Sequence, residues 1–243
     1  MSTTTPSDLP VEKDSRWQPV IDLMAGAKPV ELGVMHSYHA RKTPRRLLYT
    51  TSYYKFAAKL IASNTPPSRK GKARVLDVGC GEGIGTYLVA KECGFARGVD
   101  FDQDLIDTAR RNWVERDPSP ICEFAAKDFL LEPQADFDAV INFDVIEHIQ
   151  PANAAGFIAG MAANLKPSGL AVVGTPNVTS AQHASAVTNA GHVNLYEAER
   201  LHNEMAERFS RVFMFGANDE IVHTGFAPMC HYLIAVGVGP IQP

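Results

Sequence analysis

The segment VLDVGCGEGIGTYLVA (residues 75–90) joins an apolar, strand-like run to an apolar, helix-like run through a turn rich in glycine. Gly79, Gly81 and Gly83 stand two residues apart in this turn. In open parallel sheets such a turn lies beyond the carboxyl end of a strand, where ligands bind. The turn therefore indicates a ligand close to the backbone. The candidates are a dinucleotide, a nucleoside triphosphate and a nucleoside without phosphate.

Strand-like and helix-like segments alternate from residue 73 onward. The expected strands cover residues 73–79, 95–100, 121–127, 137–143, 169–176, 211–217 and 231–238. Apolar strands that alternate with helices predict a sheet covered on both faces. No helix separates the last two strands, which makes them antiparallel. The prediction is an α/β fold with a Rossmann-like, seven-stranded, mostly parallel sheet, an antiparallel last strand and helices on both faces.

The chain before residue 73 has a different character. Residues 1–18 are polar and contain proline, so we expect a flexible N-terminus. Residues 50–63 have apolar side chains at helical spacing, which indicates an amphipathic helix. We therefore assign residues 19–72 to an N-terminal helical lid over the sheet.

Composition limits the location and the partners. The formal net charge is −4, and basic residues gather only at residues 40–46, which disfavours nucleic acid as a partner. No apolar run reaches the ~18 residues that span a bilayer. The start of the chain lacks the pattern of a signal peptide. The four cysteines form no paired motif, so we expect reduced thiols and a cytoplasmic location.

Glycine spacing and one carboxylate separate the candidate ligands. No Gly-Lys-Ser/Thr follows the turn, so the phosphate-loop pattern is absent. The dinucleotide pattern G-x-G-x-x-G has Ile84 in place of its third glycine, and Gly85 comes one position late. Asp77 would repel a pyrophosphate but attract an ammonium or sulfonium group. These features favour S-adenosylmethionine, a nucleoside with a cationic amino acid; a strand–helix turn without a ligand is the alternative.

Residues at the ends of two later strands match the rest of such a ligand. Asp100 ends the second strand about twenty residues after the glycines, where a carboxylate accepts hydrogen bonds from both ribose hydroxyls. A helix cap is the alternative role for Asp100. Phe101 then comes next to the adenine. Asp128, followed by Phe129, ends the third strand and suits the adenine amine.

Five segments together resemble a known family. VLDVGCGEGIG, GVDFDQDLIDTAR, FDAVINFDVIEHI, LKPSGLAVVGTPN and GHVNLYEAERL are similar to the class I S-adenosylmethionine-dependent methyltransferases. The likeness is strongest to small-molecule O-methyltransferases of the ubiquinone-biosynthesis type and to sugar methyltransferases. It covers residues 73–209 and implies that residues 73–243 form a methyltransferase domain.

The resemblance also implies cofactor contacts. The methionine end would meet Asp77 and the glycines of the turn, and the sulfonium side would meet Asn142 and Phe143. In TPRRLLYT, Arg46 matches an arginine that such enzymes use on the cofactor carboxylate, with Arg45 as the alternative. The expected cofactor-binding set is Arg46, Asp77, Gly79, Gly81, Gly83, Asp100, Phe101, Asp128, Phe129, Asn142 and Phe143.

A first polar cluster flanks the expected position of the methyl group. Asp144, Glu147 and His148 are spaced i, i+3, i+4 and share one face of a helical turn. His192 follows the fifth strand on the same side of the sheet. Two carboxylates and two imidazoles can ligate a divalent cation, magnesium or manganese, which would lower the pKa of an acceptor hydroxyl. Alternatively, these residues only cap and brace the loop.

A second cluster is NDEIVHTGF (residues 218–226), between the last two strands. His223 is a candidate general base because an unperturbed imidazole titrates near neutral pH. Glu220 is a candidate beside it, and a plain hairpin is the alternative. His148 and His192 complete the set of catalytic candidates.

These observations predict an enzyme that transfers a methyl group from S-adenosylmethionine to a hydroxyl of a small-molecule acceptor, such as a sugar or a phenol. A non-catalytic module that binds S-adenosylmethionine is one alternative. A nicotinamide-dependent oxidoreductase is another, and it is opposed by the glycine spacing, by Asp77 and by the absence of a Tyr-x-x-x-Lys motif.

Overall fold

The computed structural model describes residues 15–27, 29–115, 120–130 and 136–241. The chain divides into two compact units, Met1–Val30 and Glu31–Pro243. In the first unit the described residues form a 3₁₀ turn, η2 (Ser15–Trp17), and helix α1 (Gln18–Met24). Most of the predicted flexible N-terminus, residues 1–14, lies outside the described residues.

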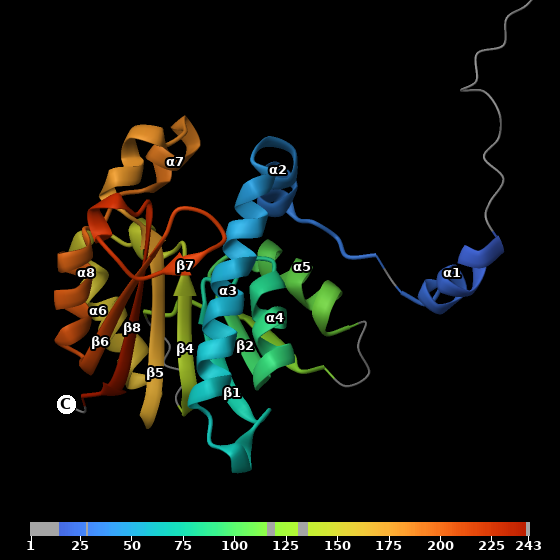
Figure 1. The fold of residues 1–243 in the computed structure, drawn as a ribbon, viewed down its shortest axis with the longest axis horizontal. Coiled ribbons are helices and arrows are strands. Elements are labelled where there is room, and N and C mark those ends of the chain that lie inside the picture. The colour runs from blue at the N-terminus through green and yellow to red at the C-terminus, as the bar shows by residue number, and fades with distance from the viewer. Residues whose placement is uncertain (1–14, 28, 116–119, 131–135, 242–243) are drawn as a thin grey trace, which may run out of the picture. The chain divides into compact units, whose positions relative to one another are not determined.

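The second unit is built on one mixed sheet, in the order β3-β2-β1-β4-β5-β8-β6-β7 (Figure 1). Strands β1 to β5 are parallel, and β8 lies antiparallel between β5 and β6. This arrangement confirms the predicted architecture. The strands are β1 (Ala73–Val78), β2 (Gly94–Asp100), β3 (Cys122–Ala126), β4 (Phe137–Phe143), β5 (Leu165–Pro176), β6 (Phe209–Ala217), β7 (Val222–His223) and β8 (Tyr232–Pro240).

The described sheet has one strand more than the seven predicted. The extra strand, β7, consists of Val222 and His223, which pair antiparallel with Ala217 and Gly216 of β6. Sequence reasoning placed both residues in a loop. A two-residue strand leaves no alternation to detect, because a period of two needs a longer run.

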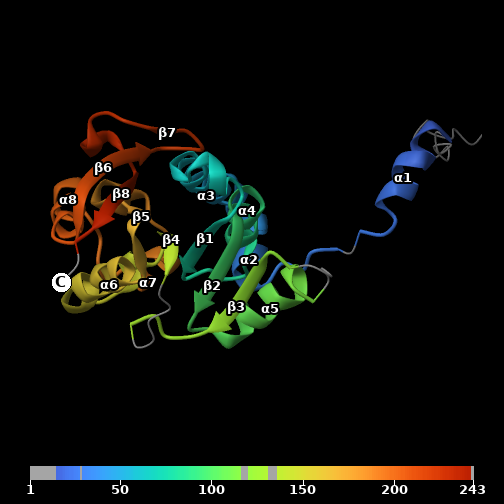
Figure 2. The same ribbon diagram turned by 90° about the horizontal axis from the view of Figure 1, so that it is seen from below.

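Helices cover the sheet on both faces (Figure 2). Residues of α3 (Pro44–Asn64), α4 (Ile84–Cys93) and α5 (Gln103–Trp113) form one core with Val75. Residues of α6 (Pro151–Ala163) and α8 (Ala198–Ala206) form a second core with Leu76. Successive side chains of a strand point to opposite faces, so β1 contributes to both cores. No apolar face of β1 remains for solvent.

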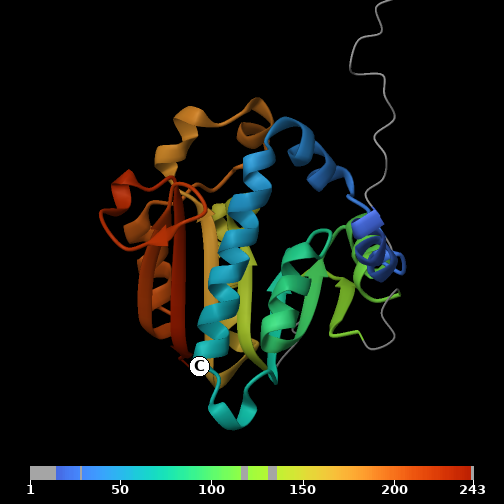
Figure 3. The same ribbon diagram turned by 45° about the vertical axis from the view of Figure 1, so that its right-hand side comes forward.

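The predicted helical lid contains α2 (Val34–Lys42) and α3, both inside the second compact unit. Helix α3 crosses one face of the sheet, with α2 at the end that reaches the carboxyl edge of the parallel strands (Figure 3). Its buried face comprises Tyr53, Tyr54, Ala57, Ala58 and Ile61, at the spacing of an amphipathic helix. Among the described helices, none is long and apolar enough to cross a membrane.

The glycine turn after β1 is shaped largely by protein side chains. Gly79, Gly81 and Gly83 have φ values of 75°, 52° and 78°. A Cβ on Gly79 would overlap Val145, and one on Gly83 would lie 2.7 Å from the Phe124 ring. A Cβ on Gly81 would meet nothing within 4 Å. Only Gly81 therefore borders open space where a ligand can approach.

Replacing Gly83 with Ala should destabilise the fold by about 1–3 kcal/mol, because a left-handed backbone and a crowded site both oppose a Cβ. Gly156→Ala is the control, since Gly156 lies exposed inside α6 with open space around it. That change should stabilise the protein by about 0.5–1 kcal/mol. Urea denaturation of both variants measures the difference, and equal effects would contradict the packing role.

Candidate functional site

Asp77 is the second-last residue of β1, just before the glycine turn, and its side chain is completely buried between α3 and α4. Its Oδ1 accepts a hydrogen bond from the Tyr54 hydroxyl at 3.2 Å. Its Oδ2 accepts one from the Thr86 hydroxyl at 2.5 Å. Burial raises the pKa of Asp77 to about 7, although both hydrogen bonds favour the ionised form. The carboxylate predicted to face a cationic ligand is therefore held in a fixed orientation.

Asp100, the last residue of β2, binds the backbone of the glycine turn that follows β1. Its Oδ2 accepts from the backbone N–H of Gly81 at 3.0 Å, and its Oδ1 accepts from Asp102 at 3.1 Å. The cap of α5 is Asp102 instead, which accepts from the backbone N–H groups of Asp104 and Leu105. Asp100 is therefore not the cap of α5, and its carboxylate lies at the glycine turn. Phe101 beside it is 86% exposed.

Two further polar residues of the predicted cofactor set, Asp128 and Asn142, differ in burial. Asp128 is exposed, and its Oδ1 accepts from the Leu130 N–H at 3.0 Å. Asn142 is buried; its Nδ2 donates to the Val78 carbonyl at 2.8 Å, while its Oδ1 has no partner among the described residues.

Two phenylalanines of the predicted set belong to the cores. Phe143 packs against the rings of Tyr53 and Tyr54. Phe129 packs edge-on against Phe157 beneath α6. Their buried rings support the strand ends, a packing role that an apolar residue at the end of a strand always allows.

Arg46 points to the carboxyl edge from the first turn of α3, whereas Arg45 is exposed. An Nη of Arg46 lies 3.2 Å from Oδ2 of Asp144. Asp144 has a φ of 56°, a conformation that aspartate adopts at a cost, and its N–H donates to the Gly174 carbonyl at 3.1 Å. The structure thus separates the two arginines that the sequence left open, and pairs Arg46 with Asp144.

Glu147 is the buried centre of the first polar cluster. Its Oε2 accepts a hydrogen bond from the Thr175 hydroxyl at 3.0 Å, and its Oε1 has no hydrogen-bond partner among the described residues. Oε1 lies 3.9 Å from Nε2 of His192. Burial, followed by the charge of Asp144, raises the pKa of Glu147 to about 8. An uncompensated carboxylate in such a place favours a proton or a cation.

Backbone hydrogen bonds bring His148 and His192 together across 44 positions of sequence. The Glu147 carbonyl accepts from the N–H groups of Val193 and Asn194. Nδ1 of His148 lies 2.8 Å from the Gly191 carbonyl, which can only accept, so Nδ1 carries the proton. In the neutral imidazole this tautomer leaves the lone pair on Nε2, as a metal ligand or a base requires.

One donor atom each from Glu147, His148 and His192 lies within 4.8 Å of the others, as a shared cation requires. Asp144 is outside this group among the described residues and pairs with Arg46 instead. Burial, His148 and Arg46 lower the pKa of His192, so its imidazole is neutral near pH 7. The sequence prediction of four ligands is supported by geometry for three.

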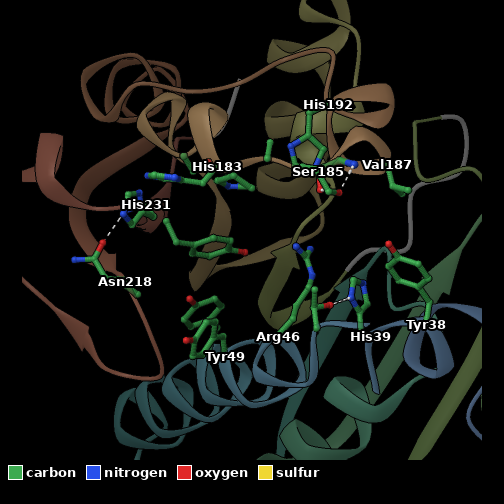
Figure 4. A pocket seen from close by; sticks show the side chains of 18 residues that line it. Tyr38, His39, Arg46, Tyr49, His183, Ser185, Val187, His192, Asn218 and His231 are labelled. Atoms are coloured by element: carbon green, nitrogen blue, oxygen red, sulfur yellow. Dashed lines mark hydrogen bonds between the residues drawn. The ribbon is translucent and has the colours of Figure 1, made fainter. Parts of the chain in front are cut away.

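A pocket of about 540 Å³ opens beside this cluster (Figure 4). Tyr38, His39, Arg46 and Tyr49 approach from α2 and α3, and His192 and Ser185 approach from the opposite side. The other lining residues are Thr43, Tyr53, Pro176, Ser180, His183, Ala184, Val187, Thr188, Ala217, Asn218, His231 and Tyr232.

The second polar cluster contributes Asn218 to this pocket, and the lining does not include Glu220 or His223. Glu220 is exposed, and His223 is half-buried in β7. The Tyr53 hydroxyl fastens the loop by donating to the Asp219 carbonyl at 3.2 Å. Of the predicted catalytic candidates, His192 lines the pocket, and His148 lies directly behind it with ring centres 5.0 Å apart.

Sequence reasoning missed several residues that the site uses. Tyr54, Thr86 and Thr175 hold the two buried carboxylates, and His39 lines the pocket with its Nδ1 2.7 Å from the Thr43 hydroxyl. Each is an ordinary residue of a helix or strand, and only its partner in space reveals its role. The one signal that the sequence carries for such a role is the run of aromatic residues Tyr53, Tyr54 and Phe56 in the expected lid helix, which makes them candidates for the lining of a pocket.

Comparison with known proteins identifies the family of the chain. The methyltransferase domain family matches residues 49–208, about two thirds of the chain. The chain belongs to this family. Its fold and motifs are those of the class I S-adenosylmethionine-dependent methyltransferases, as the resemblance predicted.

Relatives of this family match part of the chain. The ubiquinone biosynthesis O-methyltransferase of Xylella fastidiosa is 34% identical over 122 residues, 50% of this chain and 49% of that protein. A probable S-adenosylmethionine-dependent methyltransferase of Mycobacterium tuberculosis is 33% identical over 130 residues, 52% of this chain and 44% of that protein. The chain thus spans about half the length of the curated relatives it matches.

Solved structures share the fold over most of the chain. The N-methyltransferase NodS from Bradyrhizobium japonicum, in complex with S-adenosylhomocysteine, has a TM-score of 0.58 at 18% identity and covers 94% of this chain and 100% of its own. A TehB-like methyltransferase from Corynebacterium glutamicum has a TM-score of 0.59 at 20% identity and covers 84% and 98%. At these identities the likeness shows the fold alone.

Thr175→Val should destabilise the methyltransferase fold by about 1–3 kcal/mol, because it removes the hydrogen bond to the buried Glu147 carboxyl while keeping the shape of the side chain. Thr51→Val is the matched control, since the Thr51 hydroxyl donates only to carbonyls of its own helix. We expect a change below about 0.5 kcal/mol there. Urea denaturation at neutral pH compares the two, and similar stabilities would remove Thr175 from the support of Glu147.

Proposed function

We propose that this protein is an S-adenosylmethionine-dependent methyltransferase that methylates a hydroxyl of a small-molecule acceptor, such as a sugar or a phenol. One observation carries the proposal. Asp77 and Asp100 lie at the carboxyl ends of β1 and β2, and α3 connects this edge to the pocket: Tyr54 of α3 bonds Asp77, and Arg46 and Tyr53 of the same helix line the pocket with His192. A cofactor at the turn and an acceptor in the pocket would therefore be neighbours.

The residues at the edge fit the cofactor. Gly81 borders open space, and Asp100 stands next to it with an exposed aromatic ring, Phe101, at its side. The buried Oδ1 of Asn142 has no partner among the described residues, as expected of an acceptor reserved for a ligand. Arg46 supplies a cation suited to a carboxylate. These features support the sequence-based assignment of the cofactor site.

S-adenosylmethionine supplies a methyl group on a cationic sulfur, which leaves as a neutral thioether. The protein has to align the acceptor with that group and to take up the hydroxyl proton. Asp77 and Arg46 carry opposite charges and match the two charged ends of an amino acid. They would thereby fix the direction in which the methyl group points.

The lining of the pocket favours an oxygen acceptor over an amine. It contains one arginine, four histidines and several hydroxyls, and its described residues include no aspartate or glutamate. A protonated amine would find no carboxylate on this wall to offset its charge. Hydroxyl-bearing sugars and phenols can use the hydrogen-bonding groups, and the tyrosine rings offer faces for a flat or ring-shaped molecule.

His192 is suited to take the acceptor proton. It lines the pocket, and its lowered pKa keeps the imidazole neutral near pH 7. His148 packs edge-on against it with ring centres 5.0 Å apart. The lone pair on Nε2 of His148 offers a second acceptor, since Nδ1 is engaged by the Gly191 carbonyl.

The same three side chains form a candidate cation site. Glu147, His148 and His192 offer one carboxylate and two imidazoles. This donor set fits manganese better than magnesium, because magnesium prefers oxygen ligands. A bound divalent cation would lower the pKa of an acceptor hydroxyl. Without one, the two histidines remain available as bases and Glu147 braces the loop.

Asp100→Ala should weaken binding of S-adenosylhomocysteine by about 1–3 kcal/mol, since hydrogen bonds from the ribose hydroxyls to a charged group are lost. Wild-type protein should bind S-adenosylhomocysteine and should not bind NADH. Isothermal titration calorimetry measures both ligands. Tight NADH binding without any heat from S-adenosylhomocysteine would overturn the proposed function in favour of a nicotinamide-dependent oxidoreductase.

His192→Ala should weaken binding of Mn²⁺ by at least about tenfold if the cluster ligates a cation, while binding of S-adenosylhomocysteine persists. His202→Ala, on α8, is the control. Electron paramagnetic resonance of added Mn²⁺ gives the free concentration. Equal Mn²⁺ binding by the wild type and both variants, or none, would return Glu147, His148 and His192 to proton transfer and bracing.

A further inference from the structure

Helix α3 contacts the buried carboxylate of Asp77 through the side chain of Tyr54. Tyr54 is 6% exposed, and its hydroxyl donates to Oδ1 of Asp77. This bond joins residues 23 positions apart, one on the helix before the sheet and one on the first strand. Tyr54 lies outside the sequence motifs that revealed the cofactor site.

The packing around Tyr54 leaves its ring little freedom. A Cβ on Gly85 would overlap the Tyr54 ring, so the absence of a side chain at Gly85 lets α3 and α4 approach each other there. Phe143 contacts the same ring with centres 4.9 Å apart. The ring is therefore clamped between α4 and the end of β4, and its hydroxyl is directed at Asp77.

Three groups, Tyr54, Thr86 and Asp100, act on the Asp77 carboxylate from the elements around it. Tyr54 of α3 and Thr86 of α4 donate hydrogen bonds, which stabilise the ionised form. The Asp100 carboxylate opposes ionisation, and the buried Cys80 thiol stays neutral because its pKa is raised well above the usual value. No cation appears among these described neighbours. The hydrogen bonds from the Tyr54 and Thr86 hydroxyls are therefore the interactions that stabilise the negative charge of Asp77.

We propose that Tyr54 is a positioning residue for the cofactor: its hydroxyl orients the Asp77 carboxylate and maintains its negative charge, and that charge attracts the ammonium group at the amino-acid end of S-adenosylmethionine. The inference rests on the proposed function. Asp77 acts on the ligand from beneath the turn, because its side chain is completely buried. Tyr54 does not need to touch the cofactor itself.

The residue next to Tyr54 extends this role to the acceptor. Tyr53 lines the pocket, stacks on Tyr232 with ring centres 4.4 Å apart and donates to the Asp219 carbonyl. Consecutive residues of a helix point in different directions, about 100° apart. Helix α3 thus presents one tyrosine to the cofactor carboxylate and the next to the acceptor pocket, and it forms a wall common to both sites.

The test uses two ligands that differ at the amino-acid end. S-adenosylhomocysteine carries the ammonium group, and 5′-methylthioadenosine keeps the adenosine and the thioether without it. Their dissociation constants are measured by calorimetry for wild type, Tyr54→Phe and Tyr53→Phe, between about pH 5.5 and 8.5. Tyr53→Phe is the matched control, because its ring is about as buried as that of Tyr54 but its hydroxyl donates to a neutral carbonyl.

Tyr54→Phe should weaken S-adenosylhomocysteine about tenfold at pH 7 and change 5′-methylthioadenosine less than about twofold. In the wild type, affinity for S-adenosylhomocysteine should fall as the pH drops through about 7, when Asp77 takes up a proton. Loss of the Tyr54 hydrogen bond raises the pKa of Asp77. The fall should therefore begin at a higher pH in Tyr54→Phe and stay in place in Tyr53→Phe.

Thr86→Val is the second variant, because it removes the other hydroxyl from Asp77 and should move the pH dependence in the same direction. Equal losses for both ligands, or an unchanged pH dependence in Tyr54→Phe and Thr86→Val, would overturn the proposal and leave Tyr54 a packing role. Failure of the wild type to bind S-adenosylhomocysteine at all would instead refute the proposed function.

Discussion

Burial of the central strands on both faces is the constraint on which the rest of this structure depends. Val75 and Leu76 enter cores on opposite sides of the sheet, each closed by its own helices. A polar group inside either core has to find a hydrogen-bond partner, as Asp77 does with Tyr54 and Thr86. Chemistry that needs access to solvent is left with the carboxyl edge, where strands end and loops begin.

The same constraint explains how much of the fold the sequence predicted. Strands buried on both faces are apolar throughout, and glycines or polar residues mark their ends, so both signals are local. Asp100 is a predicted cofactor residue because it ends such a strand, whereas Asn142, one residue before the end of β4, is implied by the family resemblance. The competing role of Asp100 as a helix cap was settled only by the structure, since Asp102 two residues later performs it.

The unpredicted parts depend on contacts between distant residues. Glu147 and His192 meet because the Glu147 carbonyl binds the 193–194 backbone, and no local pattern encodes that bond. His223 looked catalytic in a polar loop, but the pairing of β7 with β6 gives it a place in the sheet. The sequence predicted a ligand beside all three motif glycines. Crowding by Val145 and Phe124 explains the lack of a side chain at Gly79 and Gly83, and only Gly81 of the three faces open space.

In the described part of the chain a few buried polar atoms have no hydrogen-bond partner, although buried polar atoms in proteins are normally hydrogen-bonded. Among the described residues these atoms are Asn142 Oδ1, Glu147 Oε1, Asn194 Oδ1 and Tyr232 Oη. All four lie where β4 and β5 end: Asn142 is the penultimate residue of β4, Glu147 after β4 meets Asn194 after β5, and Tyr232 pairs with Pro176 at the end of β5. Each such atom costs about 1–3 kcal/mol when nothing binds it. The unsatisfied atoms lower the stability of the fold at this edge of the sheet. That stability is recovered when a cofactor, an acceptor, a cation or water supplies the missing hydrogen bonds.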